Sequence, residues 1–287
     1  MINIMFAGNY KVFDGMLIAS LSILKHTKDP ITAYILTMDL TEKNEVFKPI
    51  NKKHIKYLNK IYKNVNPESE VKLLDITDLY KKEFENAVSD GGQYTPYTYL
   101  RLFADQIDEL PNKILYLDTD VVANNDIKEL YDIDITGYEV AGAQDYYGRW
   151  FFCSPKYMNA GVLLFNMEEL RKTKMLNKAM KLCVTKKIFL NDQTAINRLA
   201  KKKLIVNRKF NEQKKLTEKT VIRHFSMTIK FFPWFRTQNI KPWHIENVHN
   251  ILKYHQFDDI LDDYQQRMKG FDENKEPIKV KEEKSNK

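Results

Sequence analysis

Two aspartates, Asp118 and Asp120, are the residues of this sequence best suited to hold a metal ion. They follow the continuously apolar run 114–117, a pattern typical of a strand buried on both faces of a sheet. In open α/β sheets ligands bind outside the carboxyl ends of the strands, where two carboxylates suit a hard cation such as Mg²⁺ or Mn²⁺. Such an ion can bridge a diphosphate and neutralise the charge that develops as the diphosphate leaves. A second pair with the same spacing, Asp132 and Asp134, does not follow a buried strand, and we interpret it as solvated loop carboxylates.

Three further segments carry groups that could serve such a site. Asn159 lies in a polar and small cluster ahead of an apolar strand, and its amide can both donate to and accept from sugar hydroxyls. The residues 191–193 (Asn-Asp-Gln) stand where a helix is expected to begin, so an N-cap is the alternative to a ligand role. His224 ends a brief apolar strand and could supply an imidazole to a metal, although a lone histidine is more often structural.

Several short motifs occur in an order along the chain that resembles glycosyltransferase family 8. They are Phe6-Ala7, Tyr99-Leu100-Arg101-Leu102, Leu115-Tyr116-Leu117-Asp118-Thr119-Asp120, Asn159-Ala160-Gly161-Val162, Asp192-Gln193, Phe210-Asn211, His224-Phe225 and Lys241-Pro242-Trp243. The family includes glycogenin and the bacterial lipopolysaccharide galactosyl- and glucosyltransferases, and the resemblance covers about residues 1 to 245. It implies a GT-A fold, a UDP-sugar donor, Mn²⁺ as cofactor with Mg²⁺ as an alternative, and transfer with retention of anomeric configuration.

The resemblance also implies a role for each matching residue. Asp118 and Asp120 would bind the metal, with His224 as the third protein ligand. The nucleotide-sugar site would consist of Ala7, Asn9, Arg101, Asp118, Thr119, Asn159, Ala160, Asp192, Gln193 and Lys241. Within this set Ala7 and Asn9 would face the uridine, and Lys241 would hold the diphosphate.

The sequence departs from the family pattern in two places. The first loop, 6–10, is shorter than the usual Ala-x-Asp-x-Asn-Tyr and lacks its acidic residue, which affects the expected uracil contacts. The segment 226–240 separates His224 from Lys241, so Lys230 is a rival for the diphosphate. The aromatic stretch 231–235 within it could bind an acceptor sugar, touch a membrane interface or pack as a lid.

No activated nucleophile is obvious, so we expect the acceptor hydroxyl to attack on the face that UDP vacates. Gln193 would position and polarise the reacting groups, and Asp192 is the better candidate if a covalent route exists. The expected activity is transfer of galactose or glucose to a bacterial surface glycan, glycolipid or glycoprotein; no single residue distinguishes the two sugars. Two alternatives are a metal-dependent phosphohydrolase or nucleotidyltransferase, and a noncatalytic module that binds anionic polymer through lysines.

Composition limits the classes that remain. The chain has 287 residues, 43% of them hydrophobic, which is ample for a packed core. The formal charge of +8 comes from lysines spread along the chain without a recognisable nucleic-acid module, so nucleic acid is not an expected partner. We see neither a secretory signal nor a membrane span, and two cysteines, Cys153 and Cys183, suit a reducing compartment as buried thiols. These features favour a cytoplasmic protein, with peripheral membrane contact through 231–235 or a basic surface as a further expectation.

Strands that alternate with helices must position these residues, and they predict a single GT-A (Rossmann-like) domain. We expect a mostly parallel mixed sheet flanked by helices over residues 1–268, and a charged, disordered tail over 269–287. Strands are expected at 2–6, 31–38, 71–74, 114–117, 140–143, 161–165, 204–206 and 221–224. Helices are expected at 13–24, from Thr41 and Glu45 onward, at 175–184, at 191–199 and at 258–268.

Overall fold

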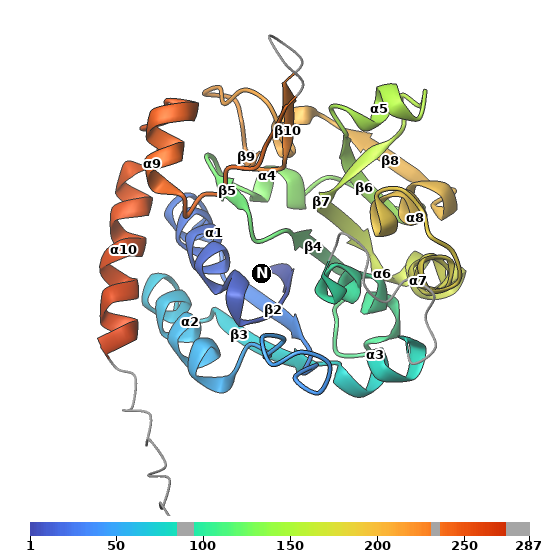
Figure 1. Ribbon diagram of the computed structural model, residues 1–287, viewed down its shortest axis with the longest axis horizontal. Coiled ribbons are helices and arrows are strands. Elements are labelled where there is room, and N and C mark those ends of the chain that lie inside the picture. Colours follow the sequence, from blue (N-terminus) through green and yellow to red (C-terminus); the bar gives the residue numbers. More distant parts are fainter. Residues whose placement is uncertain (85–94, 231–235, 274–287) are drawn as a thin grey trace, which may run out of the picture.

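A computed structural model of the chain describes residues 1–84, 95–230 and 236–273. Its main feature is a seven-stranded sheet with the strand order β3-β2-β1-β4-β7-β6-β8 (Figure 1). The strands are β1 (Ile2–Ala7), β2 (Ile31–Thr37), β3 (Glu70–Asp75), β4 (Lys113–Leu117), β6 (Val140–Gln144), β7 (Met158–Asn166) and β8 (Lys203–Val206).

Helices flank this sheet on both sides. The α-helices are α1 (Phe13–His26), α2 (Lys52–Val65), α3 (Thr77–Phe84), α4 (Lys128–Tyr131), α5 (Gly148–Phe151), α6 (Met167–Thr173), α7 (Met175–Thr185), α8 (Asn191–Leu199), α9 (Ile245–Asn247) and α10 (Asp258–Glu273). The described residues also form η1 (Tyr10–Val12), η2 (Pro96–Gln106), η3 (Arg208–Phe210) and the π-helix η4 (Val248–Leu252).

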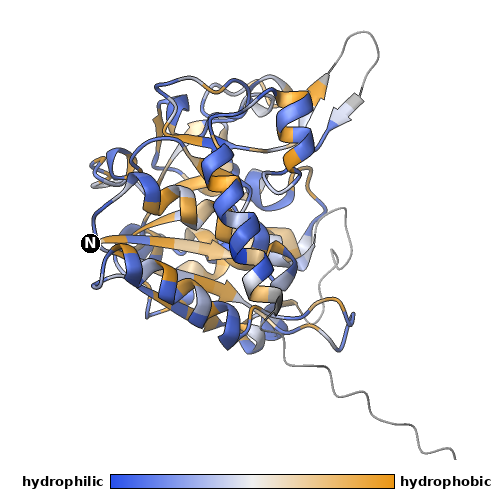
Figure 2. Cartoon of the chain, turned by 90° about the vertical axis from the view of Figure 1, so that its left-hand side faces the viewer, coloured by the Kyte–Doolittle hydropathy of each residue, from blue (hydrophilic) through white to orange (hydrophobic). Residues whose placement is uncertain are grey.

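The core consists of two apolar layers, one on each face of the sheet. Successive side chains of a strand point to opposite faces, so Leu115 and Leu117 join one layer while Tyr116 joins the other. Helices α1, α2 and α10 cover the first face, and η2, α3, α6, α7 and α8 cover the second (Figure 1). Figure 2 shows the hydrophobic strands enclosed by helices with hydrophilic outer surfaces. The prediction that residues 114–117 form a strand buried on both faces is confirmed.

The direction of β7 determines where the chemistry gathers. Strands β1, β2, β3 and β4 are parallel, whereas β7 lies antiparallel between β4 and β6. Leu117, the last residue of β4, pairs with Val162 in the middle of β7, so the first half of β7 extends beyond the end of β4. The first residues of β7 therefore lie at the carboxyl end of β4, beside Asp118. The expectation of a mostly parallel, mixed sheet is confirmed.

Two small sheets lie beside the large one. Strand β5 (Val121–Ala123) pairs antiparallel with β9 (Ile222–His224), and β10 (Thr228–Lys230) pairs antiparallel with β11 (Arg236–Gln238). The aromatic stretch 231–235 and the side chain of Lys230 lie outside the described residues, as does the terminal segment 274–287.

Three sequence-based predictions of secondary structure are wrong in detail. A helix does not begin at Thr41, because both its backbone N–H and its hydroxyl donate to the Asp39 carboxylate in a local turn. The next helix, α2, begins at Lys52 and is capped by the Asn51 side chain. Helix α8 has Leu190 as its N-cap in the left-handed conformation (φ 58°), in place of the expected Asn191 or Asp192.

The third difference concerns the end of the chain, where α10 continues past the expected residue 268 to Glu273. Of the two thiols, Cys183 is buried as expected, whereas Cys153 is exposed. Within the described part of the chain, every helix is too short or too polar to traverse a lipid bilayer.

Candidate active site

Asp118, Asp120 and His224 converge on one point at the carboxyl end of β4. One ligand atom from each residue lies within 4.8 Å of the others. The His224 Nε2 atom is 3.2 Å from Oδ1 of Asp120 and 3.8 Å from Oδ2 of Asp118. Two carboxylates and an imidazole form a mixed oxygen and nitrogen donor set, which fits Mn²⁺ or another divalent ion.

The second aspartate pair has a different environment. The side chain of Asp132 is 54% exposed and pairs with Lys128, one helical turn away. Asp134 is exposed and accepts hydrogen bonds from the backbone and hydroxyl of Thr136. The interpretation of this pair as solvated loop carboxylates is confirmed.

Backbone pairing between distant segments assembles the three ligands. The N–H of Asp118 donates to the carbonyl of Gly161 at 2.7 Å, which fixes the chain just after β4. Strand β5 pairs with β9 so that Val121 stands opposite His224, and Phe225 donates its N–H to the carbonyl of Asp120 at 2.9 Å. The pairing of β5 with β9 therefore places His224 next to Asp118 and Asp120.

Gly161 leaves the space that the ligands occupy. A Cβ atom at this position would lie 2.2 Å from Cε1 of His224 and 2.9 Å from Oδ2 of Asp118. Carbon atoms in contact are normally about 3.5–4.0 Å apart, so any larger residue would displace the ligands. The small residue in the Asn-Ala-Gly run is thus required by the close approach of the two ligands.

A lysine and the imidazole compensate the charge of Asp120. The Lys241 Nζ atom is 2.5 Å from Oδ2 of Asp120 and donates to the Phe225 carbonyl at 3.2 Å. Burial alone would raise the pKa of Asp120, but the adjacent His224 and Lys241 outweigh this effect and hold the pKa far below its usual value. Asp120 therefore remains a carboxylate throughout the neutral range.

The amide side chains of Asn211 and Asn159 orient the His224 ring through its Nδ1 atom. The His224 Nδ1 atom is 3.0 Å from Oδ1 of Asn211, and the Asn211 amide donates to Oδ1 of Asn159 at 2.9 Å. Asn159 Oδ1 also accepts from the N–H of Gly161 at 2.9 Å. A ligating imidazole with its second nitrogen hydrogen-bonded in this way has a fixed tautomer and ring orientation. Sequence reasoning gave Asn211 no role, although it stands in the Phe210-Asn211 motif.

Arg101 links the metal ligands to the neighbouring cavity. Its buried guanidinium pairs with Oδ1 of Asp118 at 3.0 Å and with Oδ2 of Asp192 at 3.2 Å. It also donates to the carbonyl of Ala160 at 2.6 Å and stacks over the ring of Tyr116. The structure therefore brings together Arg101, Asp118, Ala160 and Asp192, four of the residues that the family resemblance assigns to the nucleotide-sugar site.

Asp145 is the functional candidate that sequence reasoning missed. Its Oδ2 accepts from the amides of Asn159 (2.8 Å) and Gln193 (3.3 Å), while its Oδ1 accepts from the N–H groups of Tyr147 and Gly148. Asp145 follows directly after β6, so its position at a strand end was the signal that could have identified it.

Gln193 and Asp192 present different groups to this cavity. Oε1 of Gln193 accepts from the N–H of Ala160 (3.0 Å) and from the amide of Asn159 (3.2 Å), so the side chain is held firmly. Burial raises the pKa of Asp192 to about 6, although Arg101 acts in the opposite direction. Oδ2 of Asp192 is buried and accepts no hydrogen bond, despite its ion pair with Arg101.

These residues line a cavity of about 230 Å³ immediately beside the aspartates. Its walls consist of Thr98, Arg101, Asp118, Asn159, Ala160, Gly161, Leu190, Asp192 and Gln193. Ala7, Asn9, Thr119 and Lys241 are not among them. Ala7 ends β1, the neighbour of β4, and Lys241 lies against Asp120.

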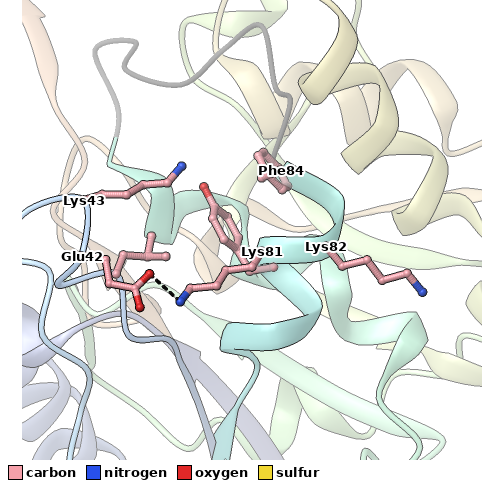
Figure 3. Close-up of a pocket in the computed structure, with 7 residues that line it drawn as sticks. Glu42, Lys43, Lys81, Lys82 and Phe84 are labelled. Carbon is pink, nitrogen blue, oxygen red and sulfur yellow. Dashed lines mark hydrogen bonds and ion pairs between the residues drawn. The ribbon is translucent and has the colours of Figure 1, made fainter.

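A separate hollow of about 270 Å³ lies between the loop after β2 and helix α3 (Figure 3). Glu42 is the only acidic residue in the described lining, and it is paired with Lys81 at 2.9 Å. Lys43 and Lys82 are the other charged residues of the lining. This hollow therefore lacks the carboxylates that a metal site needs.

Comparison with known proteins agrees with this geometry. The family described as Glycosyl transferase family 8 matches residues 2–247. Glycosyltransferase GlyA of Streptococcus pneumoniae is 32% identical over 61% of this chain and 22% of its own length. The lipopolysaccharide 1,3-galactosyltransferase of Salmonella typhimurium is 27% identical over 56% of this chain and 53% of its own length. This chain thus spans less than two thirds of either relative.

Among solved structures, the galactosyltransferase LgtC, determined with donor and acceptor sugar analogues, shares the fold. Its TM-score is 0.65 at 16% identity, and the match covers 94% of this chain and 100% of that one. The predicted GT-A architecture is therefore confirmed.

Proposed function

The chain belongs to glycosyl transferase family 8, and we propose that it is a retaining hexosyltransferase that uses a UDP-sugar and Mn²⁺. It moves galactose or glucose to a sugar hydroxyl of a bacterial surface glycan, glycolipid or glycoprotein. One observation supports this proposal above all: the cluster of Asp118, Asp120 and His224 directly adjoins a cavity lined by amides and carboxylates.

The donor set and the space kept by Gly161 fit a divalent ion. Asp118, Asp120 and His224 would hold it, and when bound it would neutralise the charge of the leaving diphosphate. Mn²⁺ tolerates a mixed oxygen and nitrogen set, and Mg²⁺ is the second candidate. Lys241 contacts the carboxylate of Asp120 and would supply a point charge to the diphosphate.

The cavity suits the sugar of the donor. Gln193 offers the second N–H of its amide and Asp192 offers a carboxylate, whereas the amide of Asn159 is fully hydrogen-bonded within the protein. Sugar hydroxyls donate to carboxylates and accept from amide N–H groups, so they can pair with both Gln193 and Asp192. Asp145 accepts hydrogen bonds from the amides of Asn159 and Gln193 and so fixes their orientation. We therefore assign it a positioning role. Ala7, which ends β1, and Asn9 are proposed to face the uridine.

The side chains favour attack on the face that UDP vacates. Gln193 is a poor nucleophile and is held by three hydrogen bonds that orient its amide. Asp192 is buried and paired with Arg101, and this ion pair lowers the availability of the carboxylate for covalent attack. We therefore propose that both residues position and stabilise the reacting sugar. Trapping a glycosyl adduct on Asp192 would overturn this mechanism, and NMR of the product anomer tests retention itself.

The activity is tested by screening UDP-galactose and UDP-glucose for Mn²⁺-dependent hydrolysis, and then screening acceptors with the better donor. Asp118→Asn should lower the rate about 100-fold or more, because a lost metal ligand should cost at least as much as a lost outer partner. Asp132→Asn is the matched control, since it changes the exposed aspartate pair, and it should retain full activity. Hydrolysis of nucleoside triphosphates or phosphomonoesters in place of UDP-hexoses would refute the proposal.

The cellular setting belongs to the same proposal. We propose a cytoplasmic enzyme that makes peripheral contact with the inner face of the membrane through 231–235 or its basic surface. Partition of the purified chain onto anionic vesicles, compared with neutral vesicles, tests this contact.

A further inference from the structure

A second cluster of metal-ligating side chains lies at the junction between η4 and α10. The Nε2 atom of His249 is 2.8 Å from Oδ1 of Asp258, and the Nδ1 atom of His255 is 3.2 Å from Oδ2. One ligand atom from each of the three residues lies within 4.8 Å of the others. The three side chains are 31%, 66% and 42% exposed, so ions in solution can reach them.

An unusual backbone brings the two histidines together. His249 lies in a π-helical turn, a rare conformation that occurs frequently at functional sites. Lys253, which caps this turn, has a left-handed backbone with φ of 58°, a conformation that costs energy for any residue except glycine. The result is that the rings of His249 and His255 stack with centroids 4.9 Å apart and an interplanar angle of 19°.

We propose that His249, His255 and Asp258 form a second metal site, selective for a borderline ion such as Zn²⁺. Four ligands about 2.0–2.1 Å from Zn²⁺ in a tetrahedron lie about 3.3 Å from one another. Each histidine nitrogen here lies 2.8 or 3.2 Å from an oxygen of Asp258, which is close to that separation. Water completes the fourth position. Two imidazoles and one carboxylate favour Zn²⁺ over the hard ions, whereas the first cluster has the more oxygen-rich set. Zn²⁺ can therefore occupy both sites, and the second site should discriminate more strongly against hard ions such as Mg²⁺.

The ion ties the C-terminal helix to the segment before it. Asp258 is the first residue of α10, and His249 belongs to η4, so the site joins the two elements. Phe257 and Ile260, beside the cluster, are buried in the layer that also contains α1. Binding to the folded chain alone raises its stability, so occupancy of this site stabilises the packing of α10 against α1.

Zn²⁺ stoichiometry separates the two clusters. Equilibrium dialysis against Zn²⁺, at free Zn²⁺ concentrations near the protein concentration, should give two bound ions per chain. The chain has six histidines, so each site can be removed by a single histidine substitution while others serve as controls. His255→Ala removes the more exposed imidazole and should leave one ion. His224→Ala should also leave one, and the double variant none. His26→Ala, in the last turn of α1, is the matched control and should leave two.

A second measurement reports the ligands directly. In His224→Ala, electron paramagnetic resonance of bound Cu²⁺ should show two coupled imidazole nitrogens, and His255→Ala in that background should abolish the signal. Added Zn²⁺ should raise the thermal midpoint of His224→Ala, and the rise should vanish when His255 is also replaced. Unchanged stoichiometry in His255→Ala, or no ion bound by His224→Ala, overturns the proposal and leaves the histidines as partners of the α10 N-terminus only. Because these readouts do not use transferase activity, they are independent of the proposed reaction.

Discussion

Gly161→Ala should damage the first metal site without altering any of its ligands. The added Cβ would lie 2.2 Å from Cε1 and 2.8 Å from Nδ1 of His224, and 2.9 Å from Oδ2 of Asp118. His224 is buried and held by Asn211, while Asp118 is held by Tyr116 and Arg101, so neither can retreat without losing a bond. Overpacking of this kind costs about 1–3 kcal/mol. If this strain destabilises the arrangement in which the residues bind the ion, Mn²⁺ affinity should drop about 5- to 150-fold.

Calorimetric titration with Mn²⁺ measures the effect, and denaturant unfolding in chelator shows that the variant folds. Gly142→Ala is the matched control, because Gly142 lies in the same sheet and its added Cβ would meet only side-chain tips within 3.4 Å. These are Cδ2 of Leu163 at 2.8 Å and Sδ of Met158 at 3.3 Å. The control should lose stability and keep its Mn²⁺ affinity. If Gly161→Ala binds Mn²⁺ within about twofold of Gly142→Ala, Gly161 does not shape the site and the reasoning is refuted.

Three further predictions concern residues around the same cluster. Asn211→Ala should weaken Mn²⁺ binding about 10- to 100-fold, because the imidazole of His224 loses its orienting partner; unchanged affinity in the same titration would contradict this role. Lys241→Met should bind Mn²⁺ up to about tenfold more tightly without nucleotide, since the ammonium no longer shares Asp120, while the KM for UDP-sugar rises; weaker metal binding would show that lysine and ion do not compete. The pKa of Asp192 is raised to about 6, chiefly by burial, so the folded chain binds this proton more tightly than the unfolded chain does. The free energy of unfolding should therefore rise as pH falls from about 6 to about 4, by on the order of 2 kcal/mol more than in Asp192→Asn. Equal pH dependence of the two proteins in denaturant titrations would exclude this contribution; Asp105, whose pKa is also about 6, is present in both and cancels.

The sequence predicted well those elements whose pattern is local. An apolar run of strand length placed β4, and residues at helical spacing placed α1, because each pattern records burial within a few neighbouring residues. The predicted secondary structure was wrong where a side-chain hydrogen bond stabilised a turn in place of a helix. The helix expected from Thr41 is absent because the Asp39 carboxylate takes both of the hydrogen bonds that Thr41 donates. The tail expected over 269–287 remains a prediction, although helix α10 extends into its first residues.

Asp118 and Asp120 could be identified from the sequence alone, because their spacing and the strand before them lie within a few residues. The physical link to His224 could not, since it depends on the pairing of β5 with β9, and only resemblance to a family had suggested it. The orienting amide of Asn211, the contacts of Asp145 and the His249–His255–Asp258 cluster likewise became visible only in the folded chain, although a strand end had marked the position of Asp145. Contacts between distant segments are determined by strand order, register and loop conformation. These depend on the packing of the whole sheet, and the short-range pattern of residue types does not encode them.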